Sequence, residues 1–153
     1  MLSRISAISG VIFGAAFLAA CTTAEPAPAS VPTAAGLPSG VHQYDATELR
    51  PGDCIDPLPD GALVTVVPCD RPHMAEFSTT YVLPDGPYPG MDDMQRLAEL
   101  GCTPRMRLVE ARKDEVIVSG LVPSEEDWPR YRTVYCLAIA SDQGPSLVGR
   151  VIM

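Results

Sequence analysis

The sequence has little positive charge, and its one strongly apolar stretch is short. Eleven Lys and Arg residues stand against nineteen Asp and Glu residues, which gives a formal net charge of −8. Nucleic-acid binding requires a basic surface that neutralises phosphates, and docking on anionic lipid requires basic residues as well. The net negative charge therefore argues against both function classes. The apolar stretch over residues 11–20 is also shorter than the roughly 20 residues that a membrane-spanning helix needs.

The common short signatures of catalytic and metal sites are absent. The sequence contains no CxxC or HxxxH pair, no serine in a GxSxG setting and no glycine-rich loop of the kind that cradles phosphates. Three aspartates between residues 53 and 60 are interrupted by prolines, which does not match a calcium-binding loop. We therefore expect neither a cofactor nor a metal site.

Residues 1–20 have the layout of an export signal. Arg4 is their only charge, the apolar stretch follows, and small residues precede Cys21. The ending Leu18-Ala19-Ala20-Cys21 resembles the lipobox of bacterial lipoproteins. In that resemblance residues 1–20 are a lipoprotein signal peptide, and Cys21 receives a diacylglyceryl group whose acyl chains hold the protein on the membrane. The alternatives are an ordinary cleaved signal and an uncleaved anchor helix.

Residues 21–43 follow as a Pro- and Ala-rich tether without aromatic side chains. Such a composition buries too little apolar surface to offset the entropy cost of ordering the chain. A semi-extended tether of this length spans roughly 70 Å, at about 3.1 Å per residue. His42 falls inside it and is expected to be incidental. A single folded domain is expected over residues 44–153.

The pattern of this domain predicts an α+β fold, with a small and mostly antiparallel sheet and one main helix. Strands that come in runs with one inserted helix favour this class over a doubly wound parallel sheet. Asp92 or Asp93 is placed to cap a helix that begins near Met94. Apolar residues from Met94 to Cys102 then share one helical face. Strands are predicted over residues 63–67, 77–83, 115–121, 133–140 and 147–153.

Five cysteines are an odd number for an exported protein, and lipidation of Cys21 leaves four. Four cysteines permit three pairings into two disulfides. We favour Cys54 with Cys69, and Cys102 with Cys136, because the last two lie on faces that are expected to be buried against each other. The alternative is a metal site, but spacings of 15, 33 and 34 residues contain no close ligand pair of the kind that structural zinc sites use.

The stretch from Cys69 to Glu76 has the most site-like composition. His73 lies three residues from both Asp70 and Glu76, a pattern that suits acid–base or metal chemistry. The sequence offers it neither a third ligand nor a nucleophile. The simplest interpretation is that His73 hydrogen-bonds within a loop beside a disulfide. A second is surface contact, with Asp70, Arg71, His73 and Glu76 as candidate partner-binding residues.

Trp128 is the only tryptophan, and it follows the acidic run over residues 125–127. An exposed Trp often anchors an interface, whereas a buried one packs in the core with its N–H bonded to backbone. We favour burial and expect the acids to form a solvated loop. Trp128 and Arg132 complete the candidate partner-binding set.

Several short segments resemble one family. The segments 49–56 and 67–76 resemble the patterns L-x-x-G-D-C-h-D and V-P-C-x-x-P-H-x-A-E, and 88–90 precedes a helix that carries Cys102. Together with a pattern near the C-terminal end of the domain, which we call the closing pattern, these segments are similar to the septum formation domain family of actinobacterial exported and membrane proteins. The similarity covers about residues 49–151. The family's small or acidic pair before Arg132 is replaced by Arg130-Tyr131. The closing pattern is carried by Pro123, Trp128, Arg132, Cys136 and Leu137.

The resemblance implies an extracytoplasmic accessory module and names no catalytic residue. The leading hypothesis is a lipid-anchored, non-catalytic binding module on the extracytoplasmic face of the cell membrane, linked to septum formation. Its partners would be membrane lipid, through the acylated N-terminus, and an envelope protein or cell-wall component. The alternatives are an envelope hydrolase or metal-dependent enzyme that uses Asp70, His73 and Glu76, and a purely structural or sensory ectodomain.

Overall fold

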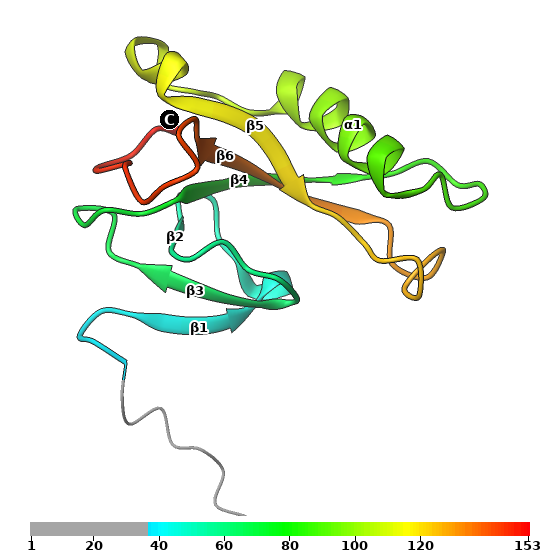
Figure 1. Cartoon of the computed structure of the whole chain (residues 1–153), viewed down its shortest axis with the longest axis horizontal. Helices are drawn as coiled ribbons and strands as arrows, with labels where there is room; N and C mark the ends of the chain where they lie inside the picture. The colour runs from blue at the N-terminus through cyan, green and yellow to red at the C-terminus, as the bar shows by residue number, and fades with distance from the viewer. Residues whose placement is uncertain (1–36) are drawn as a thin grey trace, which may run out of the picture. The chain divides into compact units, whose positions relative to one another are not determined.

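The described part of the chain, residues 37–153 of a computed structural model, is built on one antiparallel sheet (Figure 1). The strands lie in the order β1-β3-β2-β4-β6-β5, and one α-helix, α1, packs mainly against β5, β4 and β6. The predicted α+β class is confirmed. The elements are β1 (His42–Asp45), β2 (Cys54–Ile55), β3 (Leu63–Val67), β4 (Ala75–Val82), α1 (Met91–Cys102), β5 (Val116–Leu121) and β6 (Thr133–Ala140), with 3₁₀ turns at Ala46–Glu48, Thr103–Arg105 and Glu110–Glu115.

Strand β6 carries the core on both of its faces, because its side chains alternate between them. On one face Val134 and Cys136 pack against α1, and Ala138 and Ala140 pack against the C-terminal segment, residues 147–153. On the opposite face Leu137 joins a second apolar cluster, formed with residues of β2, β3 and β4. Within residues 37–153, no helix is long and apolar enough to cross a membrane.

The helix begins three residues earlier than predicted, at Met91, and neither Asp92 nor Asp93 caps it. Gly90 is the N-cap residue, with a φ of 88° that favours glycine. Both aspartates lie in the first turn, where negative charge interacts favourably with the helix dipole. The predicted apolar face is formed, because Met94, Ala98 and Cys102 are fully buried.

Two sequence predictions need correction, and strand β2 was not predicted. The predicted strand over residues 147–153 is not formed, because only Leu147 and Ile152 make isolated bridges and much of the segment's backbone bonds to side chains. The domain does not begin at residue 44, since His42 and Gln43 pair with β3. The two-residue strand β2 has no sequence signal of its own, because it is too short for any periodicity.

Both predicted disulfides are formed. Cys54 bonds to Cys69, and Cys102 bonds to Cys136, with S–S distances of 2.00 and 1.95 Å. The first joins β2 to the chain after β3, and the second joins the end of α1 to β6. The helix is therefore fixed covalently to the strand whose face it covers.

Gly101 allows α1 to approach the sheet closely. It is buried, and a Cβ atom at this position would collide with the ring of Tyr81 on β4. Gly101→Ala gains about 1 kcal/mol of helix propensity but incurs an overpacking cost of about 1–3 kcal/mol. We expect a net loss of up to about 2 kcal/mol in the free energy of unfolding, measured by urea titration.

The matched control for this prediction is Gly61→Ala, because no atom lies within 4 Å of a Cβ built there. Its unfolding curve should match that of the unaltered chain. An increase in stability for Gly101→Ala would contradict the prediction, because it would mean that the Tyr81 ring moves aside without cost.

Candidate functional site

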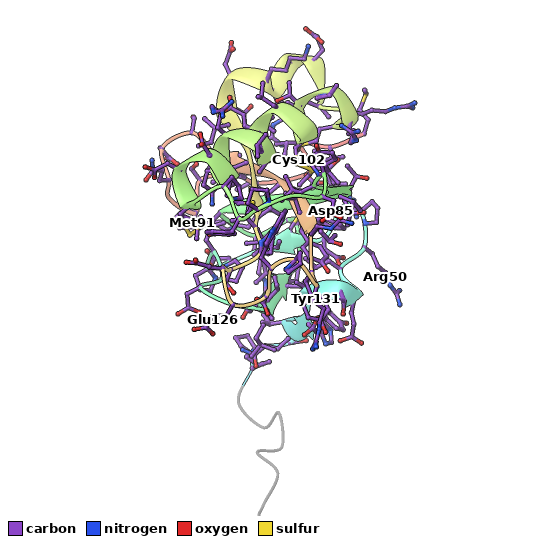
Figure 2. All side chains as sticks on the ribbon, turned by 90° about the vertical axis from the view of Figure 1, so that its right-hand side faces the viewer. Arg50, Asp85, Met91, Cys102, Glu126 and Tyr131 are labelled. Atoms are coloured by element: carbon purple, nitrogen blue, oxygen red, sulfur yellow. A yellow bond between two sulfur atoms is a disulfide. The ribbon has the colours of Figure 1, made fainter. Side chains whose placement is uncertain are left out.

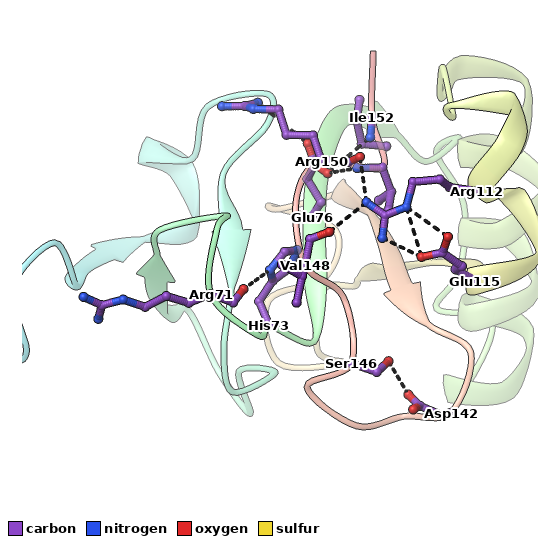
Figure 3. Close-up of polar contacts among 11 residues, drawn as sticks. Arg71, His73, Glu76, Arg112, Glu115, Asp142, Ser146, Val148, Arg150 and Ile152 are labelled. Carbon is purple, nitrogen blue, oxygen red and sulfur yellow. Dashed lines mark hydrogen bonds and ion pairs between the residues drawn. The ribbon is translucent and has the colours of Figure 1, made fainter.

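Glu76 is a fully buried carboxylate at the centre of the sequence's most site-like stretch. Its Oε2 atom accepts hydrogen bonds from the backbone N–H groups of Val151 at 2.6 Å and Ile152 at 3.2 Å. These bonds join β4 to the end of the chain (Figure 3). A carboxylate is a strong acceptor for backbone N–H groups, so Glu76 serves as an internal clasp for the C-terminal segment.

The other oxygen of Glu76 faces the guanidinium group of Arg150. Glu76 Oε1 has no hydrogen-bond partner among the described residues, and Arg150 Nη1 lies 3.7 Å away. Gly52 makes room for this arrangement, because a Cβ atom there would collide with Arg150. Gly52 also has a φ of 92°, which favours glycine. The arginine therefore lies beside the buried charge and offsets part of its desolvation cost.

His73 is also fully buried, and its side-chain hydrogen bond is local. Its Nδ1 atom lies 2.8 Å from the carbonyl oxygen of Arg71, which requires the proton to be on Nδ1. Its backbone exchanges two hydrogen bonds with Leu147, at 2.9 and 3.1 Å. This agrees with the interpretation that His73 hydrogen-bonds within a loop beside a disulfide. His73 thus holds the start of the C-terminal segment, and Glu76 holds its end.

Arg112 holds the same segment from the opposite side. Its Nη1 atom donates to the carbonyl oxygens of Val148 and Arg150, both at 3.0 Å. Its Nε atom donates to Glu115. This hydrogen bond raises the pKa of Arg112 and lowers the pKa of Glu115. We call Glu76, His73 and Arg112 the clasp, since together they hold the C-terminal segment, which forms only two isolated bridges among the described residues.

The turn before the C-terminal segment is closed by Asp142. Its carboxylate accepts from the N–H of Gly144 at 3.0 Å and from the hydroxyl of Ser146 at 2.8 Å (Figure 3). Both hydrogen bonds lower the pKa of Asp142, and the bond from the backbone N–H of Gly144 has the larger effect. The turn directs the chain from β6 back towards the clasp.

The clasp corrects part of the predicted partner-binding set. Asp70 and Arg71 are exposed, but His73 and Glu76 are fully buried and cannot touch a partner in this structure. The physical reason is that Glu76 lies inside β4 opposite Ala138, on the face that the C-terminal segment covers. The sequence has a glutamate at this position, but it does not reveal that the carboxylate accepts hydrogen bonds from two buried backbone N–H groups.

A second polar and aromatic region lies at the far end of β4. Trp128 is half-buried, its Nε1–H donates to the carbonyl oxygen of Gly86 at 2.8 Å, and its ring meets Tyr88 edge to face at 6.2 Å between centroids. The prediction of burial is therefore met in part, and the N–H is bonded to backbone as expected. Two loops, residues 83–90 and 122–132, are joined by these contacts.

Arg132 strengthens the same junction. Its Nη1 atom donates to the carbonyl oxygen of Leu83 at 3.1 Å and lies 3.8 Å from Asp85. Tyr131 beside it is 60% exposed. We call Tyr88, Trp128, Tyr131 and Arg132 the aromatic end. Figure 2 faces this end and shows Tyr131, Glu126, Asp85 and Met91 on it.

The candidate residues thus lie in two separate regions of the structure, and they do not share one surface. His73 precedes β4 and Arg132 contacts the residue after it, and the eight residues of β4 span about 26 Å at about 3.3 Å each. Sequence reasoning missed Arg112 and Arg150, whose partners are distant in sequence. It also missed Tyr88 and Tyr131, although Tyr88 lies in a Pro- and Gly-rich loop that is typical of exposed sites.

Neither of two surface hollows coincides with the clasp. One, of about 450 Å³, is lined by Pro89 to Asp93 beside the aromatic end, and the other, of about 660 Å³, lies between α1 and β5. Within residues 37–153, no group of three His, Cys, Asp or Glu side chains is placed to hold a metal ion.

Comparison with known proteins adds no relative. No protein-family model, no curated protein and no solved structure matches the chain.

Proposed function

We propose that this chain is a lipid-anchored lipoprotein on the extracytoplasmic face of the cell membrane, and that its folded domain is a non-catalytic binding module of the cell envelope. Residues 1–20 would be its signal peptide and Cys21 its lipidated residue; both lie outside the described residues. The proposed partners are membrane lipid, through the acyl chains, and an envelope protein or cell-wall component.

Two disulfides support the extracytoplasmic part of this proposal. Structural disulfides persist in oxidising compartments and are rare in the cytosol. They use Cys54, Cys69, Cys102 and Cys136. Cys21 is not used by these two disulfides, and it stands where the lipobox resemblance places the acylated residue.

The observation that carries the binding role is the aromatic end. Trp128 and Tyr88 are half-buried and fixed by backbone and ring contacts, so they form a rigid base. Tyr131 and Met91 are at least half exposed beside them. Rigid aromatic groups with exposed apolar neighbours suit interface anchors, which cost little side-chain entropy on binding. We therefore assign the contact surface to the aromatic end.

The enzymatic alternative receives no such support. Glu76 Oε2 and His73 Nδ1 are already bonded to backbone groups, and both side chains are fully buried. Asp70 is exposed, so the three residues do not share one surface. The link to septum formation remains part of the proposal and rests on the sequence resemblance.

The test uses the full chain in its own cells, with a photo-crosslinking amino acid at position 131. We expect specific adducts with an envelope component, because this side chain stands on the aromatic end. The matched control is position 63 on β3, where Leu63 is equally exposed at 59%. Equal adducts at both positions, or none at 131, would contradict the assignment of the surface.

A second arm of this experiment uses Cys21→Ala. Loss of the acyl chains should release the protein from the membrane fraction, while the crosslinked product changes only in yield. Retention in the membrane would contradict lipid anchoring. Enrichment of the unaltered chain at division sites would support the link to septum formation, and a uniform peripheral signal would remove that link.

A further inference from the structure

Strand β5 forms an open edge of the sheet, and it carries no charge, no proline and no bulge. It is the last strand in the order, and its sequence Val-Ile-Val-Ser-Gly-Leu contains no charge and no proline. Natural proteins block exposed edges with Lys, Pro, bulges or very short strands, because unpaired backbone groups pair readily with another strand. An unprotected strand of six residues is therefore a template for pairing.

The hydrogen-bond pattern shows which backbone groups face outwards. The N–H of Ser141, just after β6, donates to the carbonyl oxygen of Glu115 at 2.8 Å. Because antiparallel ladders alternate every second residue, the residues of β5 that bond to β6 are Ile117, Ser119 and Leu121, opposite Ile139, Leu137 and Tyr135. The residues that direct their N–H and C=O groups to the open edge are Val116, Val118 and Gly120.

The other edge of the sheet is better protected. Strand β1 has four residues, and its last, Asp45, is charged. Among the outward-facing groups of β5, the N–H of Val116 bonds to the carbonyl oxygen of Lys113. No hydrogen bond within residues 37–153 reaches the outward groups of Val118 and Gly120. Among the described residues, β5 is thus the edge that invites a partner strand.

The flank of α1 leaves room beside this edge. The hollow of about 660 Å³ between α1 and β5 is bordered by Arg96 and Glu99 of the helix and by Ile117 to Ser119 of the strand. Ile117, the second residue of the strand, is 46% exposed. The hollow therefore combines unpaired backbone, an exposed apolar side chain and one charge of each sign.

We propose that β5 pairs antiparallel with β5 of a second copy of this chain, so that the two sheets become one continuous sheet. Pairing of Val118 with Val118 of the second copy satisfies both outward groups of Val118 and gives the N–H of Gly120 the carbonyl oxygen of Val116 on the other strand. The uncharged strand introduces no like-charge contact along this line, despite the net charge of −8. The proposal does not depend on the proposed function.

Charge complementarity favours a second copy over an unrelated peptide. A two-fold axis perpendicular to the sheet places both α1 helices on the same face, so that the hollows join. Each α1 helix then presents Arg96 and Glu99 to the α1 helix of the second copy.

The decisive variant is Ile117→Lys. With Val118 paired to its copy, the two lysines would lie on one face at a diagonal separation of about 7–8 Å, where like charges repel. We expect the dimer to weaken at least about tenfold, because the lysines must also be desolvated. The readout is the protein mass of the full chain in detergent, by light scattering over a concentration series.

The control is Leu63→Lys, which makes the same change at an exposed residue of β3, away from the proposed interface. It should remain dimeric. Equal association of both lysine variants would overturn the proposal, because the contact would then lie elsewhere. Thermal unfolding confirms that Ile117→Lys is folded, which its exposure leads us to expect.

A second measurement needs no variant. Amide hydrogen exchange at Val118 should slow as the concentration of the unaltered chain rises, because this N–H gains a partner only in the dimer. Ser119, which bonds to β6 in the monomer, should be unaffected. A monomeric chain with an unprotected Val118 amide would overturn the proposal, and so would protection that requires added envelope extract, which would assign the edge to a strand of another protein.

Discussion

Glu76→Ala is expected to lower the free energy of unfolding by about 4 kcal/mol, measured by urea titration with both disulfides intact. The change removes the acceptor of two buried backbone N–H groups, those of Val151 and Ile152. Each buried donor left without a partner costs about 1–3 kcal/mol. The lost side chain also leaves a cavity in a closely packed region, which adds to the cost.

Glu76→Gln is the matched variant for this prediction. Its carbonyl oxygen can accept from the same two N–H groups, and its amide takes the position of Oε1, which has no hydrogen-bond partner among the described residues. We expect a loss of only about 1–2 kcal/mol, because a neutral acceptor forms weaker bonds than a carboxylate. An equally large loss in both variants would indicate that the charge opposite Arg150, and not the two hydrogen bonds, provides the stabilisation.

Amide exchange gives this prediction a local signature. The N–H groups of Val151 and Ile152 should exchange much faster in Glu76→Ala, while those of β6 should follow the global free energy of unfolding. Uniform acceleration across the sheet would contradict the view that Glu76 mainly holds the C-terminal segment. The readout thus separates a loosened segment from a generally weakened core.

Removal of the Cys102–Cys136 disulfide is expected to have a similarly large effect. The bond closes a segment with a sequence separation of 34 residues, which corresponds to about 4 kcal/mol in the chain-entropy description. Domains of this size have a total stability of about 5–15 kcal/mol. The double variant Cys102→Ala/Cys136→Ala should therefore retain only a small margin of stability, and we expect α1 to be the first element to exchange its amides.

The other disulfide is the matched control. Cys54–Cys69 has a sequence separation of 15 residues, and its loss should cost about 3 kcal/mol in the same description. It also leaves α1 attached to β6. If Cys54→Ala/Cys69→Ala proved more damaging than the first double variant, loop length would not be the governing term, and the packing around Gly52 and β2 would have to account for the difference.

The sequence by itself predicted the helix and strands in which apolar side chains recur at a regular spacing. The run from Thr133 to Ala140 is apolar and β-branched because β6 is covered on both faces, and its bounds were predicted correctly. The spacing of Met94, Ala98 and Cys102 predicted the buried face of α1 for the same reason. Cys102 lies on that face and Cys136 lies in the apolar strand. The pairing of these two cysteines could therefore also be predicted from the sequence.

Tertiary structure alone decided how the C-terminal segment is held. Residues 147–153 have a strand-like composition, yet their backbone groups bond to Glu76, His73 and Arg112 from three other parts of the chain. No local pattern encodes these partners, because each contact joins residues far apart in sequence. For the same reason the sequence treated His73 and Glu76 as candidate contact residues, whereas folding places them inside.

The sequence determined the composition of both candidate regions, and the fold determined which one is accessible. It set the net acidity, the five cysteines and the single tryptophan, from which we predicted an exported domain that does not bind nucleic acid. Only the fold placed Trp128 against Tyr88, left Tyr131 exposed and left the edge of β5 unpaired. The physical reason is that side-chain chemistry is local, whereas burial and strand order depend on contacts between distant segments.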